Sequence, residues 1–238
     1  MVKIRGLGKE YRMLPNPTLL GMQRSQPMKW ALRHIDLEVG IGEIVGIVGS
    51  NGSGKSTLLH CVVGITRPTE GVVCCEGSAV LLASNMPFHA EYTGTENISF
   101  GLTLLGVDSD SMKRCFDRAV EFSELGDDVG KPFKRLSEGQ KVRLVASVVL
   151  HSEAHTILID DFLGYADSRF QAKCLARLKA LARKGHAVIM ACHNTKGVEA
   201  IWNRALWLDR GAIVAHGNPS EIISLYEAGD VPRPVEVW

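Results

Sequence analysis

The chain carries Gly49-Ser50-Asn51-Gly52-Ser53-Gly54-Lys55-Ser56 near its beginning, with Thr57 directly behind. This stretch fits the P-loop pattern, in which a glycine and four residues of any type precede Gly-Lys-Ser. The apolar residues 43–48 are typical of a short strand, and residues 57–63 are typical of a helix. The alternative, a glycine-rich turn that binds nothing, is disfavoured because the pattern, the strand and the helix all occur together.

The chemistry of this stretch favours a phosphate ligand. Glycines let the backbone wrap around an anion with its N–H groups pointing inward, and the positive end of the following helix adds attraction. We expect residues 49–57 to bind a nucleotide in this way. Lys55 would reach the β- and γ-phosphates, and the Ser56 hydroxyl would ligate a Mg²⁺ ion that bridges them.

Composition sets outer limits on the protein. The 238 residues, with 45% hydrophobic and 22% charged side chains, suit one large globular domain, and we expect a single domain over 1–238. A formal charge of +1 provides no basic field for nucleic acid. No apolar run approaches the roughly 18 residues that cross a bilayer, and the first residues lack the apolar core of a secretion signal.

Strand and helix patterns alternate along most of the chain. Strands are expected at 2–7, 30–39, 43–48, 72–76, 79–82, 156–159, 187–191, 205–208 and 212–215, and helices at 57–63, 137–150, 169–183 and 219–226. Residues 13–28 are expected to form a surface loop, and residues 230–238 a loose tail. This order predicts an α/β fold with a mainly parallel sheet. Helical patterns at 93–105 and 109–125 predict a helical subdomain over about 93–150.

Two acids follow the apolar strand 156–159. Asp160 at the end of such a strand has the form of a Walker B segment, whose carboxylate would hold Mg²⁺ opposite Ser56. Asp161 follows directly. Taken alone, the pair could equally be a solvated turn.

Further motifs indicate a family. Leu136-Ser137-Glu138-Gly139-Gln140 resembles the signature of ATP-binding cassette (ABC) proteins, usually Leu-Ser-Gly-Gly-Gln, and Asp167 and His193 stand where the D-loop acid and the switch histidine are expected. The chain thus resembles one ABC nucleotide-binding domain along nearly its whole length. The resemblance implies a P-loop NTPase fold with an antiparallel β-subdomain and a helical insertion, and it implies ATP and Mg²⁺ as cofactors.

Three other stretches resemble one branch of that family. They are residues 64–68, 88–97 and 166–174, which are similar to the ABC proteins that export O-antigen, capsule or teichoic-acid polysaccharides. Residues 122–126 resemble the capsule-export members in particular. Some relatives carry a carbohydrate-binding domain after the cassette, and we expect none in this chain.

The resemblance also implies a shared site. Two copies would face each other head to tail, each ATP lying between the P-loop of one copy and the signature of the other. Ser137, Gly139 and Gln140 would then contact a nucleotide held by the partner copy, although Ser137 also has the form of a plain helix N-cap. Asp167 would link the two sites, and His193 would contact the γ-phosphate.

The resemblance also implies that an aromatic residue ahead of the P-loop stacks on adenine. Tyr11 and Trp30 both precede the P-loop, and we favour Tyr11. Either aromatic could instead belong to the core or to a sheet edge.

Three positions depart from the family pattern. Asp161 stands where many ABC proteins have the glutamate that orients the attacking water, and it is one methylene shorter, which predicts slow hydrolysis. Glu138 replaces the first signature glycine and brings a carboxylate near the triphosphate. His89 stands near the position of the missing Q-loop glutamine, and we expect it as a further ligand of the metal.

These features predict the ATPase subunit of a polysaccharide exporter. It would lie at the cytoplasmic face of the inner membrane as a peripheral protein, bound to a polytopic permease through the helical insertion, mainly residues 85–97. Two alternatives stay open. One is a non-transport ABC ATPase acting on nucleic acid or ribosomes, which near-neutral charge disfavours, and the other is a slow ATP-gated clamp, which Asp161 and Glu138 would suit.

Overall fold

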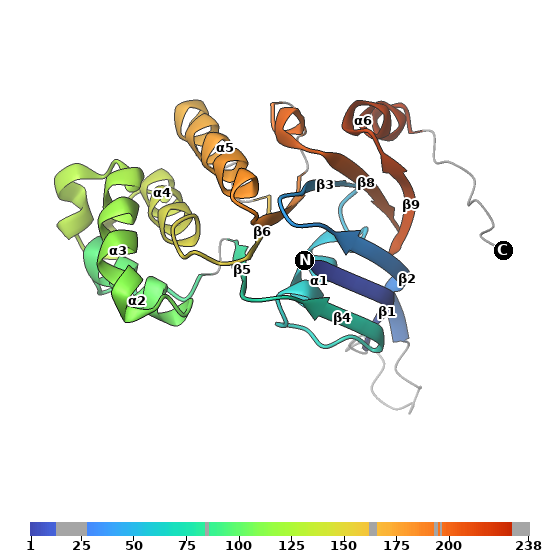
Figure 1. Ribbon diagram of the computed structural model, residues 1–238, viewed down its shortest axis with the longest axis horizontal. Coiled ribbons are helices and arrows are strands. Elements are labelled where there is room, and N and C mark those ends of the chain that lie inside the picture. Colours follow the sequence, from blue (N-terminus) through green and yellow to red (C-terminus); the bar gives the residue numbers. More distant parts are fainter. Residues whose placement is uncertain (13–27, 84–85, 162–165, 193–194, 196, 230–238) are drawn as a thin grey trace, which may run out of the picture.

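Two sheets, a layer of helices and a separate helical part make up the molecule (Figure 1). The computed structural model describes residues 1–12, 28–83, 86–161, 166–192, 195 and 197–229. Residues 13–27 of the predicted surface loop and the predicted tail at 230–238 lie outside the described residues, whereas Met28, the last residue of that predicted loop, begins a strand.

The larger sheet has six strands in the order β5-β6-β7-β3-β8-β9. Its strands are β3 (Ile44–Val48), β5 (Ala79–Leu82), β6 (Thr156–Asp160), β7 (Ala187–Ala191), β8 (Arg204–Asp209) and β9 (Ala212–Gly217). All neighbouring strands run parallel except β8 and β9. The predicted α/β class and its parallel core are therefore confirmed.

The smaller sheet is antiparallel, in the order β2-β1-β4. It comprises β1 (Val2–Arg12), β2 (Met28–Val39) and β4 (Glu70–Cys75). The sequence prediction ended the first strand at residue 7, whereas β1 continues for five more residues because β2 pairs with it as far as Arg12 and Met28. An isolated pattern does not reveal such an extension, since a distant partner strand stabilises it.

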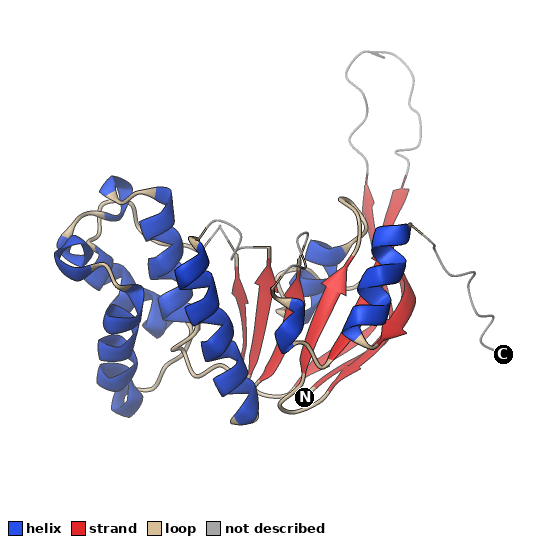
Figure 2. Cartoon of the chain, turned by 90° about the horizontal axis from the view of Figure 1, so that it is seen from above, coloured by secondary structure: helices blue, strands red, loops and turns tan. Residues whose placement is uncertain are grey.

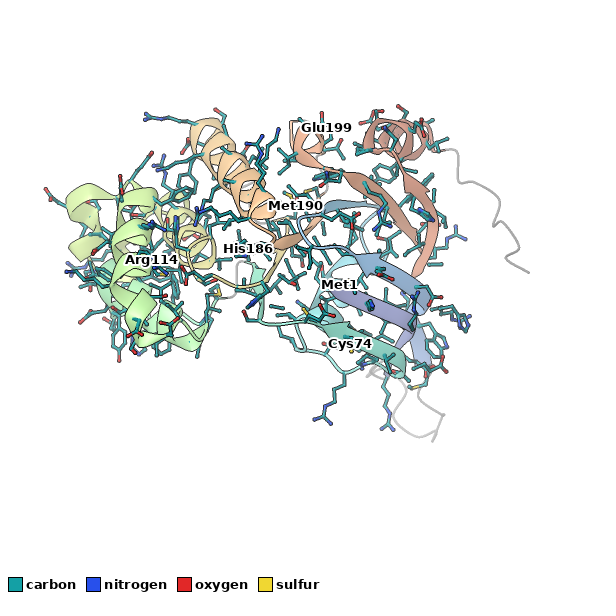
Figure 3. The ribbon with its side chains drawn as sticks, viewed as in Figure 1. Met1, Cys74, Arg114, His186, Met190 and Glu199 are labelled. Carbon is teal, nitrogen blue, oxygen red and sulfur yellow. The ribbon has the colours of Figure 1, made fainter. Side chains whose placement is uncertain are left out.

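The helix α1 (Lys55–Val62) lies between the two sheets. Leu58 and Leu59 belong to one buried apolar cluster together with Ile4 of β1 and Ile47 of β3. On the other face of the larger sheet lie α5 (Ser168–Arg183) and α6 (Pro219–Ala228). There Met190 of β7 is buried in a second cluster (Figure 3). The strand β3 contributes alternate residues to both clusters, so the P-loop follows a strand that is buried on both faces.

The helical part stands to one side of the sheets (Figure 2). It contains α2 (Gly94–Leu104), α3 (Ser109–Ser123), α4 (Glu138–Val149) and two short 3₁₀ turns at Gly126–Gly130 and Phe133–Arg135. A separate apolar cluster that includes Ile98, Ala119 and Leu144 joins the three helices. This part therefore has a small core of its own beside the sheets.

Candidate functional site

The turn between β3 and α1 forms a tight cradle. A Cβ atom built on Gly49 would lie 2.2 Å from the carbonyl oxygen of Leu208, and one on Gly54 would lie 2.6 Å from that of Ala31. Gly54 also has a φ of +110°, which L side chains rarely adopt. The backbones of two strands therefore lie against the turn, and a side chain at Gly49 or Gly54 would collide with them.

Lys55 points its ammonium back into this cradle. Its Nζ donates to the carbonyl oxygens of Gly49 at 2.7 Å and Ser50 at 3.0 Å, and the residue is only 6% exposed. Burial lowers the pKa of the Lys55 ammonium below its ordinary value, while the charges of Asp160 and Asp161 oppose this shift. The lysine is thus a buried cation held beside the loop that would receive an anion.

A pocket of about 200 Å³ opens over the cradle. It is lined by Asn51, Gly52, Gly54, Lys55, Ser56, Thr57 and Asp160. Ser56 and Asp160 therefore meet at one cavity although they are far apart in the sequence. A hydroxyl and a carboxylate oxygen are ligands that suit Mg²⁺, which commonly completes its shell with water and phosphate oxygens, so the residues present fit that ion.

Two further observations concern polar groups near the cradle. Within the described residues, the Oγ of Ser53 is buried and has no hydrogen-bond partner. The described part of the chain also contains no group of three or more His, Cys, Asp or Glu side chains arranged to hold a metal ion.

The parallel register explains how Asp160 reaches the pocket. Asp160 ends β6 and pairs with Ala191 at the end of β7, the strand that separates β6 from β3. Carboxyl ends of parallel strands meet at one edge of the sheet, where ligands of open α/β sheets bind. Asp161 follows with its N–H donating to the carbonyl oxygen of Ala191 at 3.0 Å and with a φ of 48° in the left-handed region.

The signature residues do not line this pocket. Ser137 caps α4, its Oγ accepting from the N–H of Gln140 at 3.3 Å while Oε1 of Gln140 accepts from the N–H of Ser137 at 2.9 Å. Nε2 of Gln140 also donates to Asp128 at 2.6 Å. A Cβ built on Gly139 would meet no atom within 4 Å. Nothing within the described chain therefore explains a glycine at that position.

Glu138 lies at the surface, at the beginning of α4. Its side chain is 86% exposed and pairs with Lys141 at 2.7 Å, one turn further along α4. The lysine partly compensates the carboxylate that replaces the usual signature glycine.

Asp167 caps α5 and at the same time binds α4. One of its carboxylate oxygens accepts from the N–H of Phe170 at 3.0 Å, and the other pairs with Arg143 at 2.6 Å. The Phe170 hydrogen bond and the Arg143 guanidinium hold the pKa of the Asp167 carboxyl below its usual value. Arg143 also pairs with Glu124 at 3.2 Å. Sequence reasoning missed Arg143, because no local pattern marks an arginine whose partners lie about 20 residues away on either side.

His89 is the residue that the sequence predicts as a further metal ligand. His89 precedes α2, where its backbone N–H donates to Asn97 and its ring lies 4.4 Å from that of Tyr92. It does not line the pocket. The residue that follows β5, beside the end of β6, is the buried Ala83, which has no group to ligate a metal. Metal ligation by His89 stays a prediction.

The remaining candidates are only partly located. His193 lies outside the described residues. Tyr11 is 40% exposed at the end of β1, under the ammonium of Lys9, and Trp30 carries the guanidinium of Arg33 on its ring. Neither aromatic lines the pocket, so the choice between Tyr11 and Trp30 stays a prediction.

A glycine cradle, a buried lysine and a strand-end aspartate at the open edge of a parallel sheet define a P-loop domain. Comparison with known proteins shows which family of P-loop proteins the chain belongs to. It belongs to the ABC transporter family, which matches residues 32–163.

Relatives of known name agree with this. The chain is 39% identical over 197 residues to the "ABC transporter protein AbcA" of Aeromonas salmonicida, an alignment that covers 82% of this chain and 64% of that protein. It is 36% identical to an "O-antigen export system ATP-binding protein RfbB" of Klebsiella pneumoniae, with coverages of 83% and 80%. It is 31% identical to the "Teichoic acids export ATP-binding protein TagH" of Bacillus cereus, with coverages of 95% and 42%. The chain thus spans well under two thirds of the length of that last relative.

Solved structures support the fold. An ATP-binding cassette seen as a dimer in a post-hydrolysis state with ADP and Pi matches with a TM-score of 0.78 at 22% identity, over 92% of this chain and 99% of that one. An ATP-binding subunit of an ABC transporter matches with a TM-score of 0.78 at 18% identity, over 99% and 96%. The predicted cassette fold is confirmed.

Proposed function

We propose that residues 1–238 form one cassette that binds and hydrolyses ATP and thereby drives export of a cell-surface polysaccharide through a separate permease. The observation that carries the proposal is the pocket in which Lys55, Ser56 and Asp160 meet over the glycine cradle. This arrangement suits a triphosphate with its Mg²⁺. The polysaccharide class is supported by the names of the O-antigen and teichoic-acid relatives.

Different residues of the chain bind the phosphates, hold the metal and orient the attacking water. The N–H groups of residues 49–54 and the Lys55 ammonium bind phosphate oxygens, and Ser56 and Asp160 hold the metal, which neutralises charge on the phosphates. Asp161 orients the attacking water, and His193 contacts the γ-phosphate. Tyr11 stacks on adenine.

The other half of the site comes from a second copy. Ser137, Gly139 and Gln140 lie outside the pocket of their own chain, and the open space at Gly139 is suited to close approach by a phosphate. Asp167 links the two sites. Its carboxylate pairs with Arg143 of α4, the helix that begins with the signature, and Asp167 itself lies a few residues after Asp160 in the chain. A head-to-tail dimer of two identical copies gives each pocket its missing half.

The permease contact is proposed for the outer side of α2. Tyr92, Phe100 and Leu104 are 44%, 40% and 55% exposed, and the rings of the first two lie 6.4 Å apart. Phe100 and Leu104 are one helical turn apart and share a face. Within the described residues, no helix is both long and apolar enough to cross a bilayer. We propose that the cassette meets the cytoplasmic face of the membrane through this exposed apolar contact.

Mixing two defective subunits tests the shared site. Lys55→Ala removes a P-loop function and Ser137→Ala a signature function, and each variant alone should lose ATP-dependent dimerisation and turnover. A mixed dimer contains one doubly defective pocket and one intact pocket. We expect the mixture to recover ATP-dependent dimerisation, measured by light scattering, and part of the ATPase activity. No recovery from two properly folded variants would rule out the composite pocket.

A second candidate function is a slow ATP-gated clamp. Asp161 is one methylene shorter than glutamate and sits at a left-handed φ of 48°, and both features change the reach of its carboxylate. Turnover measured with the permease present separates the two functions. Stimulated turnover supports the exporter, whereas nucleotide binding with negligible turnover supports the clamp.

A further inference from the structure

The side-chain amide of Asn97 hydrogen-bonds to the backbone of the turn at residues 89–93. This side chain is fully buried, and its Nδ2 lies 3.0 Å from the carbonyl oxygen of His89 and 3.1 Å from those of Tyr92 and Thr93. Its Oδ1 accepts from the N–H of His89 at 2.8 Å. One amide thus satisfies donors and acceptors around the whole turn, so the turn has one well-defined shape.

The segment 131–134 is hydrogen-bonded along this turn. The N–H of Phe133 donates to the carbonyl oxygen of Tyr92 at 2.8 Å, and the N–H of Lys134 donates to that of Ala90 at 3.0 Å. The Lys134 ammonium also pairs with Glu91 at 2.7 Å. The same segment leads directly into Ser137, so the turn and the approach to the signature form one hydrogen-bonded unit.

Phe133 contacts both sides of this unit. Its ring packs edge to face against Phe88, with centroids 5.4 Å apart, and the Lys141 ammonium lies 5.8 Å from the ring centroid. Its carbonyl oxygen accepts from the N–H of Leu136 at 3.1 Å. Phe88 precedes the turn, whereas Lys141 lies in the first part of α4. One ring therefore bridges the turn and the start of the signature helix.

A third contact holds the cap of α4 itself. Gln140, whose amide oxygen binds the N–H of Ser137, donates from Nε2 to Asp128 in the preceding 3₁₀ turn. The orientation of Ser137 is consequently set by residues 126–134 and not by α4 alone.

We propose that Phe133 and Asn97 are positioning residues that couple the turn at 89–93 to Ser137. Displacement of the turn by a bound partner then changes the orientation of the signature, and engagement of the signature changes the turn by the same coupling free energy. The use of this coupling in export rests on the proposed function. The coupling within the chain does not, because every contact that makes it is internal.

Hydrogen exchange of the isolated full chain tests the coupling. We expect Phe133→Ala to accelerate exchange of the amides at 137–142 about tenfold, because loss of the ring removes the contacts to Phe88 and Lys141, while exchange in α1 stays unchanged. Phe100→Ala is the matched control, since that ring packs on Tyr92 at the outer side of the turn. It should leave exchange at 137–142 at the wild-type rate.

A second variant keeps the test valid if the alanine variant does not fold. Phe133→Leu retains an apolar side chain without the ring, and we expect the same pattern at about threefold. Faster exchange at 89–94 with unchanged exchange at 137–142 would overturn the proposal for either variant. A uniform acceleration over the whole chain, including α1, would also overturn it, because that result indicates only lower global stability.

Nucleotide measurements separate positioning from binding. Phe133→Leu and Asn97→Asp should bind MgATP with wild-type affinity, since the P-loop is untouched, and should lose about tenfold in turnover and in stimulation by the permease. Unchanged turnover would contradict the coupling. If wild-type protein itself shows no stimulation by a permease, the export function fails, while the exchange experiment still decides the coupling.

Discussion

In the proposed function, Asp161 orients the attacking water, and the rate of hydrolysis should depend on it directly. Its charge acts on Lys55, and its backbone N–H is hydrogen-bonded to the end of β7, so it lies at the same edge of the sheet as the P-loop pocket. Asp161→Asn keeps the size and removes the carboxylate. We expect turnover to fall by at least about 100-fold with MgATP affinity retained, because the change removes a general base and leaves the phosphate cradle intact. Single-turnover kinetics and equilibrium nucleotide binding measure the two effects, and unchanged turnover would exclude Asp161 from the reaction.

His151 is a second residue with a measurable consequence, and this one concerns stability. It is 6% exposed, and burial lowers the pKa of its imidazole to about 4, with Arg177, Arg118 and Lys173 acting in the same direction. The unfolded chain binds a proton near pH 6.5, whereas the folded protein does not until about pH 4. The stability that this histidine contributes is therefore complete above pH 6.5 and is lost as the pH falls toward 4.

This gives a numerical prediction for unfolding. Between pH 7 and pH 5, wild-type protein should lose about 2 kcal/mol of unfolding free energy more than His151→Gln, whose amide does not titrate. Urea unfolding at the two pH values measures the difference. Equal losses in the two proteins would show that His151 is not buried in its neutral form.

At the scale of elements, α4 combines a well-capped beginning with one residue that weakens it. Ser137 and Gln140 form a complete capping box. Gly139 lies between them in the first turn, and a Cβ added to it would meet no atom within 4 Å. Glycine in a helix costs about 0.5–1 kcal/mol relative to alanine. The helix therefore carries a destabilising residue where its own chain does not require one.

Gly139→Ala should consequently separate stability from function. We expect the free energy of unfolding to rise by up to about 1 kcal/mol and ATP-dependent dimerisation to weaken at least about tenfold, because the new methyl group would meet the partner's nucleotide. Denaturant unfolding and light scattering with ATP measure the two effects. A variant that is more stable and dimerises normally would mean that no phosphate approaches this glycine.

At the scale of the whole molecule, the two halves of the proposed nucleotide site are carried by different parts of the chain. The P-loop pocket lies at the edge of the larger sheet, whereas the signature caps α4. Figure 1 shows that α4 belongs to the helical part, which stands beside the sheets. Arg143 joins these parts by pairing with Asp167 and Glu124. Motion of the helical part relative to the sheets would therefore change the approach of the signature to a partner copy.

The proposed permease contact belongs to the same scale. Replacing Tyr92 and Phe100 together by serine should abolish co-purification with a membrane partner and leave MgATP binding and folding unchanged, since both side chains are exposed. Leu225→Ser is a suitable control, because Leu225 is a similarly exposed apolar residue, 38% exposed, on α6. Co-purification of the double variant at wild-type yield would exclude this patch as the contact.

Much of the local chemistry was determined by the sequence alone. The P-loop, the strand that ends at Asp160 and the cap at Ser137 are patterns of neighbouring residues, and each occurs in the structure within one or two positions of its prediction. Backbone conformation and capping depend on side chains a few residues apart, so a short stretch contains the information they need.

The tertiary structure alone decided which of these pieces meet. Strand order brings Asp160 to Ser56 and leaves His89 with Asn97, and the packing of α4 against α5 joins Arg143 to Asp167. The exposure of Glu138 and the open space at Gly139 were equally invisible in the sequence. The physical reason is that such contacts join residues far apart in the chain, and their geometry is fixed only when the sheets and helices pack together.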